Sequence, residues 1–362
     1  MPETPISERL KQFTSSIAPG VFLVGYVIGT GSVTTMAAAG AKYGLSLMWT
    51  GVVAALFTYV MIVAISKVTI VTGKTLLQNF RTHFGASPAI FIMAGLMTTQ
   101  IASIIGVMGI VSDVVREATT PLTSDGTGIP PLYSAAFFTL LLYGLFWIGR
   151  HQAFLKVLAI LVTTMGFSFM ATMLVVLPGP MEFIEGLIPS VPTEGNAQLL
   201  IAGMVGTTMA GVCLVTRSTL VIEKGWTSGD FRTEHRDAFI SVTMMLVINV
   251  AIMAAAAGTL FVRGIEVRHA VDMIRALEPF AGSLAAMLFT VGIISAGLSS
   301  LFPNYLLSIW LLADYFDLPR DPRRPLYRIL VAACASTGLA IPIFGGSPVA
   351  IMIASQAISP II

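Results

Sequence analysis

Two clusters of glycine and hydroxyl residues interrupt apolar stretches of this sequence, and their residue types suit the binding of a small solute. The first cluster lies in the apolar run 22–44 and comprises Gly29, Thr30, Gly31 and Ser32. The second lies in the run 201–221 and includes Thr207, Ala210, Gly211 and Val212. Glycine disfavours a helix by about 1 kcal/mol relative to alanine. We therefore expect both helices to break at these points, exposing backbone groups and hydroxyls.

Such breaks have a specific meaning in an apolar chain. Irregular backbone inside a membrane persists only where protein or a water-filled cavity satisfies its polar groups. We expect Ser32 to cap a helix that resumes at Val33. The alternative is that Gly25, Gly29 and Gly31 form a small-residue face for helix packing.

Residues that usually bind transition metals or transfer protons are missing from the centres of the apolar runs. None of the 18 Asp and Glu residues lies in the middle of a run, and the four His residues fall in loops or at run ends. Cys213 and Cys334 lie in apolar runs without a CxxC motif. We therefore assign no metal ligand, expect no cofactor, and do not expect an enzyme.

The composition identifies the solvent of this chain as lipid. Hydrophobic residues make up 56% of the 362 positions and charged residues only 10%, whereas soluble domains carry about 25% charged residues. No basic, aromatic-interleaved patch indicates nucleic acid. The chain is therefore predicted to be an all-α, multi-pass integral membrane protein with lipid as its surroundings, and no pattern indicates its oligomeric state.

Apolar runs long enough to cross a bilayer number about ten. They are 19–41, 46–71, 88–112, 132–149, 154–178, 198–222, 238–262, 282–312, 326–344 and 347–362. The two interrupted runs are the first and the sixth, so five spans separate them. Breaks at matching positions of two halves indicate an inverted repeat with a binding site near the bilayer midplane. We predict one transmembrane domain over 1–362, with repeats at 19–178 and 198–362.

The distribution of Lys and Arg predicts the orientation. With segment 1–17 in the cytoplasm, 15 of the 20 Lys and Arg residues lie on that side, as the positive-inside rule requires. We expect a bacterial-type inner membrane or a plasma membrane. The last span stops at "QAISPII" with no polar tail, so either the chain ends in the bilayer or the sequence is a truncated form.

The sequence resembles the Nramp family of divalent metal transporters, which share the fold of the bacterial leucine transporter. Stretches that carry the resemblance are "GYVIGTGSVTTMAAAGAKYG", "TGKTLLQNFRTHFG", "GLIPSVPT" and "RDAFISVTMMLVINVAIM". The resemblance covers nearly the whole chain. It implies a leucine-transporter-like fold with a 5+5 inverted repeat, broken first and sixth helices, and alternating access to a central site.

The metal-site motifs of that family are changed here. Gly29, Thr30, Gly31 and Ser32 replace its Asp-Pro-Gly-Asn, and Ala210, Gly211 and Val212 replace its Met-Pro-His. In "TTQIASIIG", Gln100 and Ser103 stand where the family has the two carboxylates of its proton route. Arg217 occupies the position of a second histidine, and Gln356 in the tenth span matches a polar site residue. Gln100, Ser103 and Arg217 are therefore candidates for a gate or an ion pathway.

Three interpretations remain open. The first is transport of a divalent cation that stays largely hydrated, as Mg²⁺ does readily, rather than of Mn²⁺ or Fe²⁺ with proton coupling. The second is transport of a small anion, carboxylate or amino acid, because helix N-termini attract negative charge and Arg217 could contact it. Arg217 could instead snorkel to the cytoplasmic surface. The third is a scaffold of the same fold that does not transport.

Overall fold

The computed structural model describes residues 29–149, 151–176, 179–193, 195, 197–319, 321 and 323–359. Segment 1–17 and the part of the first predicted span before Gly29, including Gly25, lie outside these residues. Within them the chain is helical, and seven helical segments are long and apolar enough to cross a membrane. These seven segments correspond to predicted spans two to eight.

The first five-span half contains α2 (Thr30–Tyr43), α3 (Met48–Thr72), α5 (Ala86–Thr119), α6 (Pro131–Ile148) and α7 (His151–Val176). A nine-residue helix, α4 (Leu76–Phe84), separates α3 from α5. A capping box stabilises its start: the Thr75 hydroxyl accepts a hydrogen bond from the Gln78 backbone amide, and the Gln78 side chain accepts one from the Thr75 backbone amide. Another short helix, α8 (Pro180–Gly186), precedes the second half.

The second half contains α9 (Ala197–Thr208), α10 (Gly211–Lys224), α11 (Phe231–Thr259), α13 (Ala285–Phe316), α14 (Pro325–Thr337), α15 (Ala340–Phe344) and α16 (Pro348–Ile358). A four-residue helix, α12 (Glu278–Ala281), precedes α13. The predicted sixth span is interrupted between α9 and α10, as expected. The predicted ninth span, 326–344, is not one helix, because the chain turns at Gly338 and Leu339 between α14 and α15.

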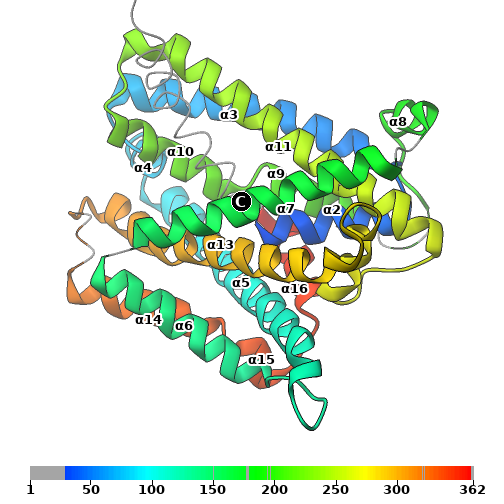
Figure 1. Ribbon diagram of the computed structural model, residues 1–362. Helices are drawn as coiled ribbons and strands as arrows, with labels where there is room; N and C mark the ends of the chain where they lie inside the picture. Colours follow the sequence, from blue (N-terminus) through cyan, green and yellow to red (C-terminus); the bar gives the residue numbers. More distant parts are fainter. Residues whose placement is uncertain are drawn as a thin grey trace, which may run out of the picture.

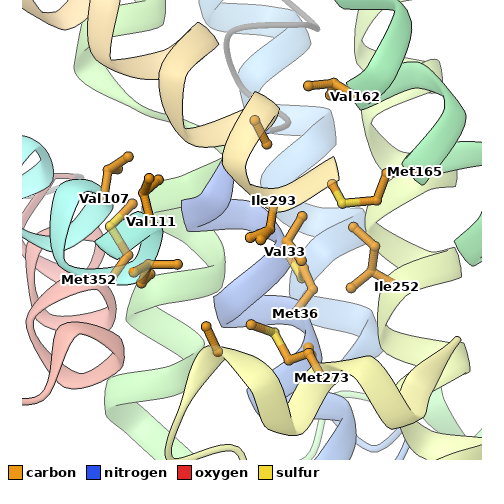
Figure 2. Close-up of a cluster of buried hydrophobic side chains, with 14 of the residues drawn as sticks. Val33, Met36, Val107, Val111, Val162, Met165, Ile252, Met273, Ile293 and Met352 are labelled. Atoms are coloured by element: carbon orange, nitrogen blue, oxygen red, sulfur yellow. The ribbon is translucent and has the colours of Figure 1, made fainter. Parts of the chain in front are cut away.

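The short central helices are surrounded by the long ones (Figure 1), with α14 and α6 side by side at one edge of the bundle. α2 packs against α11, while α16 packs against α5 and α9. Figure 2 shows Val33 and Met36 of α2 among Ile252, Ile293 and Met273, which come from the helices around it. The central helix of the first half is therefore buried in protein instead of lipid, and this permits its polar residues.

Gly40 allows α2 to approach α11 closely, and we expect Gly40→Ala to destabilise the protein. A β-carbon at this position would lie 2.3 Å from the Met253 carbonyl oxygen, and a backbone atom cannot move aside as a side chain can. Overpacking of this kind costs about 1–3 kcal/mol. Thermal unfolding in detergent should show a lower midpoint for Gly40→Ala.

Gly51→Ala is the matched control, because a β-carbon there would meet only Leu246 Cδ1 at 4.0 Å. Alanine is the better helix former by about 1 kcal/mol, so this variant should be as stable as the parent or slightly more stable. Equal midpoints for the two variants would contradict the close α2–α11 contact.

Candidate functional site

A polar cavity lies where the start of α2 and the α9–α10 break meet α5, α13 and α16. Its volume is about 60 Å³, enough for about four waters or for a small ion with part of its hydration shell. The residues around it come from the start of α2, the α9–α10 junction and three other helices. They are Gly29, Thr30, Gly31, Thr99, Gln100, Ser103, Val107, Thr207, Ala210, Val212, Cys213, Ser300, Asn304, Met352, Ser355, Gln356 and Ser359.

α2 begins at this cavity. Gly29 is its extended N-cap residue, with φ −94° and ψ −171°, and Thr30 is the first helical residue. The expectation that Ser32 caps a helix starting at Val33 is therefore wrong. Ser32 already lies in the helix, and its hydroxyl is 2.9 Å from the Thr207 hydroxyl. This contact joins α2 to α9 directly, across 175 residues of sequence.

Helix α9 ends at Thr208, and α10 begins at Gly211, so the break is the dipeptide Met209–Ala210. The Thr58 hydroxyl of α3 donates a hydrogen bond to the Thr208 carbonyl at 3.3 Å. The Asn249 amide of α11 lies 3.5 Å from the Thr208 hydroxyl. Side chains of neighbouring helices thus satisfy groups that the interrupted helix leaves exposed, which is the condition for such a break inside a membrane.

Most of the residues predicted for the site border this cavity. Gly29, Thr30, Gly31, Thr207, Ala210, Val212 and Gln356 all do, together with the pathway candidates Gln100 and Ser103. Ser32 does not border the cavity, but its hydroxyl is hydrogen-bonded to the hydroxyl of the lining residue Thr207. Gly211 faces α5, since a β-carbon there would lie 2.8 Å from Leu96 Cδ2.

Arg217 is placed differently from both expectations, which were contact with a substrate and snorkelling to the surface. It does not border the cavity, and its side chain is fully buried, with an exposed fraction of 0%. Its guanidinium binds the carboxylates of Glu234 and Asp237 on α11. The expectations failed because sequence alone could not show that two carboxylates of the next helix point inward at this depth.

Several residues of the lining were not predicted from the sequence, and the polar ones among them matter most for binding. They are Thr99 on α5, Ser300 and Asn304 on α13, and Ser355 and Ser359 from the α16 end of the chain. Ser300–Asn304 and Ser355–Ser359 are pairs four residues apart in apolar runs. That spacing places both members on one face of a helix, and this is the signal that could have identified them.

The chemistry of the lining is neutral and rich in oxygen. The lining residues include three amide side chains and several hydroxyls, and none of them is Asp, Glu, His, Lys or Arg. Thr30 Oγ1 is buried and has no hydrogen-bond partner among the described residues. No group of three His, Cys, Asp or Glu side chains that could hold a metal occurs in the described part of the chain.

Comparison with known proteins agrees with this architecture. The family model described as "Natural resistance-associated macrophage protein-like" (Nramp) matches residues 20–362. The divalent metal cation transporter MntH of Erwinia tasmaniensis is 30% identical over 290 residues, covering 76% of this chain and 66% of the relative. MntH of Klebsiella pneumoniae is 29% identical over 289 residues, covering 77% and 67%. The chain thus spans about two thirds of the length of these curated relatives.

Solved structures show the same fold at low sequence identity. A manganese transporter from Eremococcus coleocola superposes with a TM-score of 0.70 at 17% identity, covering 98% of this chain and 78% of its own. A nucleobase-cation-symport-1 family transporter gives 0.65 at 16% identity, covering 93% and 74%. The fold and the cavity define an integral membrane protein of the leucine-transporter-like class. Within that class, the chain belongs to the Nramp family.

Proposed function

We propose that this protein is a secondary transporter that moves a divalent cation, largely hydrated, by alternating access to the cavity between the two helix breaks. The observation that carries the proposal is the cavity itself, bordered by Thr30, Thr207, Gln100, Asn304 and Gln356. Relatives in the same family are divalent metal cation transporters, so a metal cation is the first choice of substrate.

The neutral lining supports retention of water by the ion. Amide and hydroxyl oxygens suit hard cations such as Mg²⁺, whereas a site that selects Mn²⁺ or Fe²⁺ over Mg²⁺ needs softer imidazole or sulfur ligands. Neutral oxygens repay little of the cost of removing water from a divalent ion, and Mg²⁺ keeps several waters when bound. A cavity of about 60 Å³ leaves room for part of this hydration shell.

The same lining argues against proton coupling at the cavity. Gln100 and Ser103 border it at the positions where the family resemblance places carboxylates, and neither side chain titrates near neutral pH.

The positive-inside distribution of Lys and Arg supports a cytoplasmic N-terminus for this transporter.

Reconstitution into liposomes tests this function. We expect Mg²⁺ entry, read with an internal Mg²⁺-sensitive dye, to saturate and to proceed at the same rate with and without a pH gradient. Mn²⁺ should not produce high-affinity uptake with coupled acidification of the lumen. Robust Mn²⁺/H⁺ symport would contradict the proposed chemistry of the cavity.

A small anion or carboxylate is the second candidate substrate, because two helices begin at the cavity. α2 and α10 have Gly29 and Ala210 as N-caps, and neither cap makes a side-chain hydrogen bond to the helix. Free amides at helix N-termini attract negative charge. A thermal-shift panel of Mg²⁺, Mn²⁺, inorganic anions and amino acids separates the two candidates. Stabilisation by no member of the panel would favour the scaffold interpretation.

A further inference from the structure

A buried ion cluster joins α10 to two neighbouring helices on one side of the cavity. Arg217 Nη2 lies 3.1 Å from Glu234 Oε1, its Nη1 binds Asp237, and its Nε donates to Ser66 Oγ of α3 at 3.2 Å. The Arg217 guanidinium also lies over the Trp226 ring, 5.4 Å from its centroid. The exposed fractions of the three charged side chains are 0–1%, so they are shielded from bulk solvent, and the partly exposed His235 lies 3.3 Å from Glu234 Oε2 at the edge of the cluster.

Burying three charges is costly, so this cluster calls for an explanation beyond packing. The same contacts could fix α10 in place only to stabilise the fold. The position of the cluster relative to the cavity gives it a further role.

Arg217 lies directly beyond a residue of the cavity wall. Cys213, which borders the cavity, precedes Arg217 by four residues, so both lie on one face of α10, about 6 Å apart along its axis. On α3, Ile62 likewise precedes Ser66 by four residues, and on α11 Ala238 follows Glu234 by four residues, so each apolar residue shares a helix face with a member of the cluster. Ile62, Cys213 and Ala238 belong to one buried apolar cluster.

On α3 and α10 the ion cluster lies one turn beyond these apolar residues, and on α11 Glu234 does so, while Asp237 directly precedes Ala238. The layer next to the cavity is apolar, and the layer beyond it is the ion cluster. A backbone contact extends the second layer to α4, since the Leu76 amide donates to Ser218 Oγ at 3.1 Å. A solute leaving the cavity along this face of α10 has to pass both layers.

We propose that the Arg217–Glu234–Asp237 cluster is a gate that closes the cavity on the side that faces the C-terminal half of α10. Arg217 acts as a positioning residue, because it holds the face of α10 that carries Cys213 against α3 and α11. Opening of the path separates this face of α10 from α11 and weakens the cluster. The proposal builds on the proposed function only in treating the cavity as the binding site.

Cys213 provides a native reporter of the gate, because it lies in the cavity wall and is only 2% exposed. The measurement is the rate at which a small maleimide modifies Cys213 in a Cys334→Ser background, with the protein in lipid nanodiscs. Two variants weaken the cluster without removing it. Glu234→Gln leaves the pair between Arg217 and Asp237, and Arg217→Lys leaves a lysine that can pair with a carboxylate of α11. Loss of a hydrogen bond between charged groups should raise the Cys213 rate by about tenfold in at least one variant.

Two controls distinguish a gate from general loosening. The first control is Cys334 on α14, which is 4% exposed and whose sulfur lies 3.2 Å from the Ser308 hydroxyl of α13. Its rate of modification by the maleimide should stay the same when Glu234→Gln and Arg217→Lys are made in a Cys213→Ser background. Arg263→Met breaks an exposed ion pair with Glu278 and should leave the Cys213 rate unchanged.

The gate is refuted if neither Glu234→Gln nor Arg217→Lys raises the Cys213 rate, or if both cysteines become reactive to the same extent. The assay needs no transported substrate. If the variants raise the Cys213 rate but the protein takes up no Mg²⁺, the proposed gate therefore stands and only the proposed substrate is wrong.

Discussion

Replacing Arg217 with methionine is expected to destabilise the protein by about 3–5 kcal/mol, the usual cost of removing one partner from a buried ion pair. The reason is that Glu234 and Asp237, with exposed fractions of 0% and 1%, would lose the guanidinium that binds both of them. A strong drop in the thermal unfolding midpoint in detergent, or failure to accumulate folded protein, is the expected readout.

A rescue variant tests the cause of that loss. When Glu234→Gln and Asp237→Asn are added to Arg217→Met, the uncompensated charges disappear and most of the stability should return. Replacing a whole buried ion cluster with uncharged residues is often close to neutral. Equal stability of the single and triple variants would mean that Arg217 stabilises the fold by packing alone. Arg268→Met, which removes an exposed ion pair with Glu266, should change the midpoint little.

Replacing Gly31 with leucine should abolish most transport while leaving the fold intact. A β-carbon at Gly31 would lie 2.6 Å from Met352 Cε and 2.9 Å from Gln356 Nε2. Both atoms are near the ends of flexible side chains, so the helices can keep their places while the longer leucine side chain fills cavity space beside Gln356. An overpacking energy of about 1–3 kcal/mol that opposes solute binding corresponds to a decrease of about 5-fold to 150-fold in the uptake rate.

The control for Gly31 is Gly144→Leu on α6, where a β-carbon would meet no atom within 4 Å. This variant should fold and transport like the parent. Uptake and unfolding midpoints should be measured on the same preparations, so that a folding defect is separated from a blocked cavity. Unchanged uptake by Gly31→Leu would mean that the first break serves helix packing and not solute binding.

Much of the architecture could be predicted because the membrane imposes strong local rules. Long apolar runs with few charges gave the spans that became α3, α5, α6, α7, α11 and α13. The Gly-rich cluster near Ala210 predicted the interruption that the structure places at Met209–Ala210. The ninth span was predicted less well. A turn at Gly338 divides it into α14 and α15, and a single glycine in an apolar run is not enough to predict a turn.

Assignment of the site required knowledge of side-chain direction. Gly211 and Ala210 are neighbours in sequence, yet Ala210 borders the cavity while Gly211 faces Leu96. Asn304 and Ser300 were overlooked because isolated polar residues in a long span can face any neighbour. Arg217 was placed within the sixth span from the sequence, but neither its full burial nor its two carboxylate partners were predicted.

By itself the sequence determined that this chain is a helical membrane protein with an interrupted sixth span and that carboxylates are missing from the centres of its spans. These properties depend on composition and on local helix propensity, which are readable one segment at a time. Only the tertiary structure decided which polar groups share the cavity and that Arg217 binds Glu234 and Asp237. The physical reason is that burial and ion pairing depend on contacts between helices far apart in sequence, and these contacts are set by packing of the whole bundle.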